Sequence, residues 1–226
     1  MPKYLLIFEK SESVRWLGHL DILRTFERAI RRAGLPVAFS TGFNPRERIA
    51  FASALSTGVT AGAEPAVLEL TDPVDPATLL SGLNTTLPPG IRIGACQEVP
   101  DVGSRDLLNS YDRADYEVVC ACAPNTEEAE VSGAIDALLE RPQWEIVRAR
   151  EGRSRNLDIR PYLFALTLVP ESLTSNRLTL AMTVAIGEGG NAKPPEVVAL
   201  LAEQIVGLTL RRSHRARLLS SATVAV

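Results

Sequence analysis

The order of hydrophobic and polar positions along this chain predicts two halves of alternating strands and helices. In the first half, short apolar runs that favour extended structure lie at residues 4–9, 37–39, 49–51, 66–70 and 91–96. Residues 20–33 instead repeat apolar side chains with the period of an amphipathic helix. A second helix is expected up to about residue 83, because Asp75 offers an N-cap and Pro76 suits the first helical position. Residues 52–64, rich in Gly, Ser, Thr and Ala, are interpreted as irregular.

The second half repeats this order without obvious sequence identity. Strands are expected at residues 116–121, 144–150, 162–169, 178–186 and, as a strand or an extended tail, 208–219. Helices are expected at residues 125–139 and 194–206, the first opened by Asn125 with Glu128 in a capping-box spacing. Strand, helix, strands, helix, strand is the split βαβ order. We therefore expect an α+β protein of two tandem ferredoxin-like domains with antiparallel sheets, at residues 1–100 and 116–226, joined by a polar linker at 101–115.

The first helix has a basic face. Arg24, Arg28 and Arg31 recur at steps of four and three, so they stack on the side opposite the apolar stripe, and Arg32 widens the basic side. Asp21 and Glu27 stand three and four residues before Arg24 and Arg31, so part of this charge is expected to be paired. The face is interpreted either as a polyanion-binding surface or as a solvated face of an arginine-rich protein.

The polar loop after this helix adds to the basic surface. Alternation along the extended run places Arg46 and Arg48 on one side and Glu47 on the other. Gly42 and Asn44-Pro45 supply the turn chemistry. Two arginines near Phe43 suit phosphate contact with base stacking. Phe43 is equally interpretable as a plug that anchors the loop to the core.

The overall charge of the chain weakens the polyanion-binding interpretation but does not exclude it. The net charge of −3 argues against a general nucleic-acid protein, yet residues 1–50 hold nine basic and five acidic side chains. Of the 24 basic residues only three are lysine, and arginine favours flat bidentate contact with phosphate. Codon bias of an Ala-, Leu-, Pro- and Arg-rich genome is the competing explanation.

The chain offers few candidates for chemistry. His19, at the start of the first helix, is either a general base for RNA cleavage through a neighbouring 2′-hydroxyl or a hydrogen-bonded structural histidine. The chain has three cysteines, an odd number without metal-ligand spacing, so we expect reduced thiols and no metal site. No phosphate-binding or dinucleotide motif is present, and we therefore expect no cofactor on this chain. With no apolar run of 18 residues and no signal-like N-terminus, the expected location is the cytoplasm.

Four segments carry a resemblance to a known family: LGHLD at 17–21, FERA at 26–29, RRAGLPV at 31–37 and STGFNPR at 40–46. The chain resembles the radical SAM-linked family, a bacterial domain of unknown function. Members are fused to, or encoded beside, a cobalamin-binding-type radical SAM protein, so the resemblance implies that partner. It covers residues 3–100 closely, and DIRPY at 158–162 and KPPEV at 193–197 look like later landmarks. Many members have proline where this chain has Glu47. The family brings no established catalytic residues.

Three functional hypotheses follow. The first is a non-catalytic accessory protein that binds RNA and presents it to the radical SAM partner; its candidate binding residues are Arg24, Arg28, Arg31, Arg32, Phe43, Arg46 and Arg48. The second is a metal-independent RNA endonuclease using His19. The layout also resembles tandem ferredoxin-like proteins of the CRISPR repeat-processing type, some of which use a histidine. The third is a protein-only scaffold whose basic helix docks an acidic patch on the radical SAM enzyme.

Overall fold

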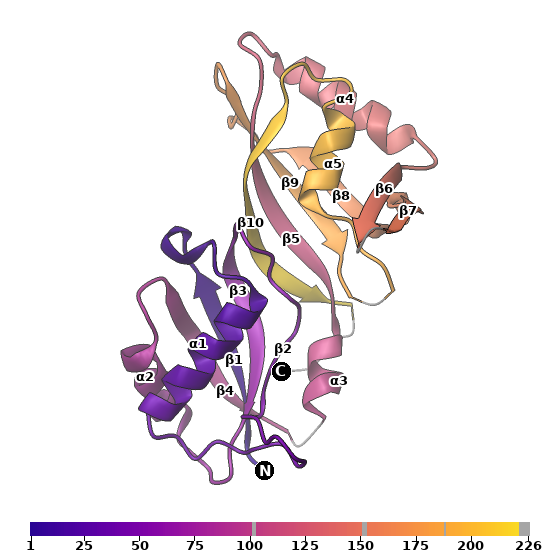
Figure 1. Ribbon diagram of the computed structural model, residues 1–226. Coiled ribbons are helices and arrows are strands. Elements are labelled where there is room, and N and C mark those ends of the chain that lie inside the picture. The colour runs from indigo at the N-terminus through magenta and orange to yellow at the C-terminus, as the bar shows by residue number, and fades with distance from the viewer. Residues whose placement is uncertain (101–102, 151–152, 188, 222–226) are drawn as a thin grey trace. The chain divides into compact units, whose positions relative to one another are not determined.

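The computed structural model describes residues 1–100, 103–150, 153–187 and 189–221 (Figure 1). The fold is mixed α+β with mostly antiparallel sheet pairing. The chain divides into two compact units, one formed by Met1–Asp112 with Arg217–Val226 and the other by Arg113–Ala216. No helix in the described residues is long and apolar enough to cross a membrane.

Unit 1 contains the basic helix. Its elements are β1 (Lys3–Lys10), the 3-10 turn η1 (Glu12–Val14), α1 (His19–Arg32), β2 (Ile49–Phe51), β3 (Val59–Glu69), α2 (Pro76–Thr86), β4 (Ile91–Val99) and α3 (Ser104–Asn109). The strands lie in the order β4-β1-β3-β2, and each neighbouring pair is antiparallel. The predicted α1 is confirmed within a residue at each end, and Asp75 caps α2 by accepting from the Thr78 N–H at 2.9 Å.

Strand alternation gives β1 two different faces. Tyr4, Leu6 and Phe8 point to a core shared with α1 and α2, whereas Leu5 points to the opposite face, where it packs with Leu108 of α3. In the first core Phe26 of α1 is fully buried, with its ring centroid 5.0 Å from Phe8 and 5.4 Å from Phe51. These edge-on aromatic contacts fix which face of α1 turns inward.

Unit 2 repeats the strand order of unit 1. Its elements are β5 (Tyr111–Ala121), α4 (Glu128–Glu140), β6 (Glu145–Arg150), β7 (Arg153–Asp158), the 3-10 turn η2 (Arg160–Tyr162), β8 (Leu163–Leu168), β9 (Arg177–Ala185), α5 (Pro194–Leu201) and β10 (Thr209–Ser220). The sheet order is β10-β5-β9-β8, with the antiparallel pair of β8 and β9 as predicted. β6 and β7 form a separate two-stranded sheet. Trp144, which is 1% exposed, anchors this unit's core by donating from Nε1 to the Leu138 carbonyl at 2.9 Å.

Several local predictions were wrong for identifiable reasons. Part of the stretch interpreted as irregular, 52–64, belongs to β3, because its backbone pairs with β1 (Lys10 opposite Ala61) despite poor strand formers. The capping box at Asn125 does not form: Asn125 has φ of 68°, and α4 begins only at Glu128. The stretch expected as a linker, 101–115, holds α3 and the first residues of β5.

The cysteine thiols lie in apolar surroundings. Burial raises the pKa of Cys120 to about 12 and that of Cys96 to about 11, with Cys122 and Asp75 as the respective secondary causes. Because the thiolate is the reactive form, both native thiols are expected to alkylate very slowly at pH 8, and all three cysteines rapidly in denaturant. Mass spectrometry after a timed iodoacetamide pulse measures this. Rapid native labelling of Cys120 would contradict its burial.

Candidate nucleic-acid interface

The exposed face of α1 carries the four predicted arginines. Ile22, Phe26, Ala29 and Ile30 form the buried face, and Arg24, Arg28, Arg31 and Arg32 all lie on the exposed one. Asp21 does not pair with Arg24: its carboxylate accepts from the Gly18 N–H at 3.0 Å and caps the helix. In the part of the chain that the structure describes, neither Arg24 nor Arg28 forms an ion pair or a side-chain hydrogen bond. Both guanidinium groups are therefore available to an external anion.

Arg31 joins the last turn of α1 to the polar loop. It donates to the carboxylate of Glu47, whose side chain is only 2% exposed, so the predicted partner Glu27 is replaced. This hydrogen bond holds the pKa of Glu47 below its ordinary value, against the opposing effect of burial. The same hydrogen bond raises the pKa of Arg31. The pair places residues 46–48 next to the C-terminal end of α1.

The loop itself is closed and projects its tip into solvent. Phe39 bridges to Glu47, Ser40 N–H donates to the Arg46 carbonyl at 2.8 Å, and Arg46 N–H donates to Ser40 Oγ at 3.0 Å. Phe43 at the tip is fully exposed, so its interpretation as a core plug is wrong. Arg46 is also exposed and has no ion-pair partner among the described residues.

Arg32 and Arg48 are held by contacts within unit 1. Arg48 forms an ion pair with the largely buried Glu69 at 3.1 Å, while its own side chain is 45% exposed. Arg32 donates to the carbonyl of Thr86 at the end of α2, a contact that leaves its charge unneutralised. Of the six candidate arginines, Arg24, Arg28, Arg32 and Arg46 therefore have no carboxylate partner within the described part of the chain.

His19 lies at the edge of the aromatic core. It is half-buried as the first residue of α1, and its ring meets Phe51 edge-on at a centroid distance of 5.6 Å. Phe51 in turn packs on Phe26 and Phe8. This packing favours the structural interpretation of His19. Among the described residues, no group of three or more His, Cys, Asp or Glu could hold a metal.

The segments that look like the second-half landmarks stabilise unit 2. Asp158 Oδ1 accepts from the backbone N–H of Trp144 at 2.8 Å and from that of Arg160 at 2.9 Å. Glu196 holds Arg148 through two hydrogen bonds of 2.7 Å and also accepts from the Lys193 N–H at 2.9 Å. The side-chain hydrogen bond to Glu196 is the main reason that the pKa of Arg148 is raised. These contacts tie the β6–β7 hairpin and η2 to neighbouring elements.

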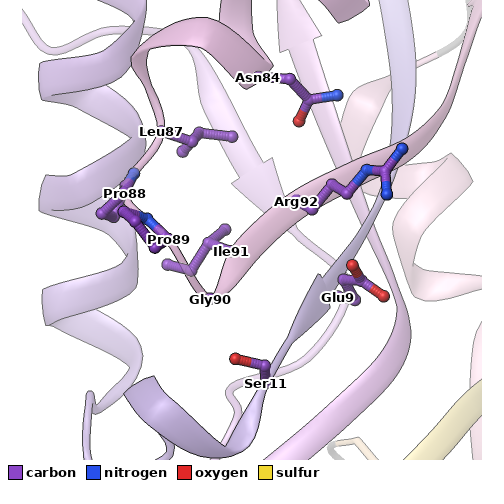
Figure 2. Close-up of a pocket in the computed structure, with 9 residues that line it drawn as sticks. All are labelled: Glu9, Ser11, Asn84, Leu87, Pro88, Pro89, Gly90, Ile91 and Arg92. Atoms are coloured by element: carbon purple, nitrogen blue, oxygen red, sulfur yellow. The ribbon is translucent and has the colours of Figure 1, made fainter.

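Unit 1 also has an open pocket of about 440 Å³ between the ends of β1 and β4 and the C-terminal end of α2 (Figure 2). It is lined by Glu9, Ser11, Asn84, Leu87, Pro88, Pro89, Gly90, Ile91 and Arg92. The Asn84 side-chain amide forms two hydrogen bonds with the backbone of Ile93. It donates to the Ile93 carbonyl at 2.9 Å and accepts from the Ile93 N–H at 2.8 Å. Glu9 and Arg92 are cross-strand neighbours. The amide of Asn84 is therefore used by the fold.

Sequence reasoning assigned no role to two further features of unit 1. Trp16, in the loop before α1, is 66% exposed, and Lys10 at the end of β1 is completely buried. The adjacent Arg15 guanidinium lies 4.5 Å from the Trp16 ring centroid. An arginine–tryptophan pair at 15–16 is visible in the sequence, whereas the burial of Lys10 depends on tertiary contacts.

Family comparison identifies the chain at a coarse level. The family described as "Uncharacterized protein conserved in bacteria (DUF2344)" matches residues 3–194. The chain belongs to this family. The match includes the whole candidate interface of the DUF2344 chain and extends to the first residue of α5. No curated protein matches the chain.

Three solved structures similar to the DUF2344 chain are described as Cbf5 or H/ACA complexes. A chain of a Cbf5-Nop10-Gar1 complex aligns with a TM-score of 0.54 at 10% identity, covering 97% of this chain and 50% of that one. A chain of an H/ACA RNP bound to a substrate RNA containing 2′-deoxyuridine aligns with a TM-score of 0.53 at 9% identity, covering 97% and 49%. A third, from the archaeal box H/ACA sRNP Nop10-Cbf5 complex, gives 0.51 at 10% identity. The DUF2344 chain spans about half the length of these chains, and the likeness shows a shared fold.

Proposed function

We propose that this DUF2344 protein binds RNA through the basic face of unit 1 and presents it to a cobalamin-binding-type radical SAM enzyme. The observation that carries the RNA part is the exposed, unpaired state of Arg24, Arg28 and Arg46. Arg31 contacts Glu47. Arg28 lies one helical turn before Arg31, and Arg46 is next to Glu47, so the charges of Arg28 and Arg46 belong to one surface. In this proposal the iron–sulfur cluster, the cofactor and the chemistry belong to the enzyme.

The chemistry of this surface favours RNA over a small anion. Guanidinium groups spread along a helix and a loop match a repeating row of phosphates, and Phe43 offers an aromatic face for a base. One similar structure contains a substrate RNA, which adds fold-level support. With a net charge of −3 for the whole chain, the attraction has to come from this local patch.

Fluorescence anisotropy with labelled RNA at several salt concentrations tests the RNA part. Each phosphate contact to a single strand should contribute about −0.7 to the slope of log K against the logarithm of the salt concentration, so three contacts predict a slope of about −2. Absence of any salt-dependent affinity for cellular RNA would overturn the proposal. Sequencing RNA crosslinked to the protein in cells would identify the ligand.

The radical SAM partner is proposed from the sequence resemblance. Tagged protein should capture a cobalamin-binding-type radical SAM enzyme from cell extract. Capture that survives nuclease treatment and disappears when α1 is made acidic would favour the scaffold alternative, in which the basic helix docks an acidic protein patch. Capture lost on nuclease treatment favours RNA as the bridge.

The endonuclease alternative makes a separate prediction about His19. Because the ring packs edge-on against Phe51, we expect wild type and His19→Ala to leave RNA equally intact over hours without added metal. Gel analysis of end-labelled RNA measures this. Faster cleavage by the wild type than by His19→Ala would establish the nuclease and displace the accessory role.

Glu47→Gln is expected to strengthen RNA binding. The substitution removes the acid that neutralises Arg31 and frees one more guanidinium for phosphate. Affinity should rise by about 2- to 5-fold, and the salt slope should steepen by about 0.7. Glu98→Gln, the same charge change at an exposed position of β4, is the control and should change affinity less.

The same pair sets a pH dependence of stability. Since folding lowers the pKa of Glu47 below 4.5, the ionised carboxylate stabilises the fold fully above that pH, and the stabilisation is lost as pH falls through the lowered value. Urea denaturation at pH 7 and pH 3 should therefore show a smaller acid-induced loss of stability for Glu47→Gln than for wild type. Equal losses would contradict the ion pair.

We also propose that both units are ferredoxin-like. The orders β4-β1-β3-β2 and β10-β5-β9-β8 become identical when strands are numbered within each unit and the β6–β7 hairpin is treated as an insertion. In both units a helix follows the first strand and another precedes the last.

A further inference from the structure

The side chain of Lys10 is completely buried and holds the backbone on both sides of Trp16. It is 0% exposed at the end of β1, and its Nζ donates to the carbonyls of Arg15 at 2.8 Å and Leu17 at 2.7 Å. A buried ammonium is tolerated only when its hydrogens meet acceptors, so these contacts hold the backbone firmly. The two carbonyls belong to the residues on either side of Trp16.

A second contact, from the turn just before β3, holds the backbone of Arg15. The Gly58 N–H donates to the Arg15 carbonyl at 2.8 Å. Gly58 has φ of 83°, and a Cβ there would lie 3.3 Å from Cζ3 of Trp16, so the indole rests against glycine backbone. Lys10 and Gly58 together fix both the chain at Trp16 and the seat of its ring.

The ring that is fixed in this way faces solvent. Trp16 is 66% exposed, and the Arg15 guanidinium lies 4.5 Å from its ring centroid, in a cation–π contact. Leu20, the second residue of α1, is also 62% exposed. A large aromatic side chain held rigidly in water costs solvation free energy that an external ligand would recover.

The location of Trp16 links it to the basic face. Trp16 lies three residues before His19, the first residue of α1, and at about 1.5 Å of rise per residue Arg24 lies about 8 Å along the axis from the helix start. Arg28 and Arg31 follow, and Arg31 leads to the loop that carries Phe43. The arginines of α1 are therefore preceded and followed along the chain by an exposed aromatic ring.

We infer that Trp16, with Arg15 against it, is a stacking platform for an unpaired nucleobase, so that the RNA bound by this surface is single-stranded. The inference rests on the proposed RNA-binding function. In an A-form duplex the base faces are covered by neighbouring pairs, whereas a single strand exposes them to aromatic side chains. A row of arginines between two aromatic rings offers a single strand both a phosphate track and stacking faces.

Tryptophan fluorescence gives a direct test, because the chain has two tryptophans and Trp144 is 1% exposed. A 12-nucleotide single-stranded RNA should quench the solvent-exposed emission and protect it from acrylamide, while a 12-base-pair RNA duplex at the same concentration should not. Trp16→Phe should lose this signal and keep most of the affinity. Trp16→Ala should weaken single-strand binding by about 5- to 150-fold.

The controls separate this inference from the function on which it rests. Val206→Ala removes another exposed apolar side chain, in unit 2, and should bind RNA like wild type. Salt-dependent RNA binding that survives Trp16→Ala without quenching would overturn the platform and leave the RNA function standing. Absence of all RNA binding would overturn both. Protection of Trp16 only by a protein partner, after nuclease treatment, would mark a protein-docking residue instead.

Discussion

Arg28→Glu combined with Arg46→Glu is expected to weaken RNA binding by about 100-fold at moderate salt. Both side chains are exposed, and neither has an ion-pair partner among the described residues, so reversal removes attraction without breaking a native contact. A loss of about 1.4 kcal/mol for each reversed charge gives this factor. The salt slope should become shallower by about 1.4, the contribution of two phosphate contacts to a single strand.

A matched variant shows whether position or net charge matters. Arg105→Glu with Arg177→Glu makes the same change at exposed positions on α3 and β9, outside the candidate interface. It should lower affinity by only a few-fold, as a long-range effect that added salt removes. Equal losses in the two double variants would mean that general charge, rather than a defined surface, attracts RNA.

Phe26→Ala is expected to destabilise unit 1 by about 3–5 kcal/mol, the range for truncating a fully buried phenylalanine. Its ring is 0% exposed and meets the rings of Phe8 and Phe51 at 5.0 Å and 5.4 Å. The loss leaves a cavity under α1, at the centre of the face that positions the arginines. Urea denaturation followed by circular dichroism measures the change.

Phe43→Ala is the matched control, because the same side chain is removed from a fully exposed position. It should change the free energy of unfolding by less than about 0.5 kcal/mol, as expected for surface substitutions. If Phe43→Ala were as destabilising as Phe26→Ala, the loop would have to be packed against the core after all.

Periodicity predicted those parts of the fold that depend on local pattern. The apolar stripe of α1 is confirmed, with Ile22, Phe26 and Ile30 buried, because helical phase decides which side chains can reach the core. The start of β3 was missed, since Gly62 and Pro65 argue against a strand and only pairing with β1 stabilises one there.

The candidate site was predictable in its residues and less so in its pairing. Spacing suggested Glu27 as the partner of Arg31, but the chain turns back at Gly34 and brings the buried Glu47 to Arg31 instead. The residues around Arg31 in the sequence do not predict its contact with a residue on the far side of the turn. The anchoring of Trp16 by Lys10 was missed for the same reason, because a lysine at a strand end is ordinarily expected in water.

The division of the chain has a consequence for biosynthesis. Unit 1 takes its last part from the end of the sequence: residues from Arg217 onward belong to it, and the Ser221 N–H donates to the Asp112 carboxylate at 3.1 Å. The unit translated first is therefore completed last, after the whole of unit 2 has left the ribosome. A nascent chain must keep an unfinished sheet soluble for that interval, and such long sequence separation between contacting segments slows folding.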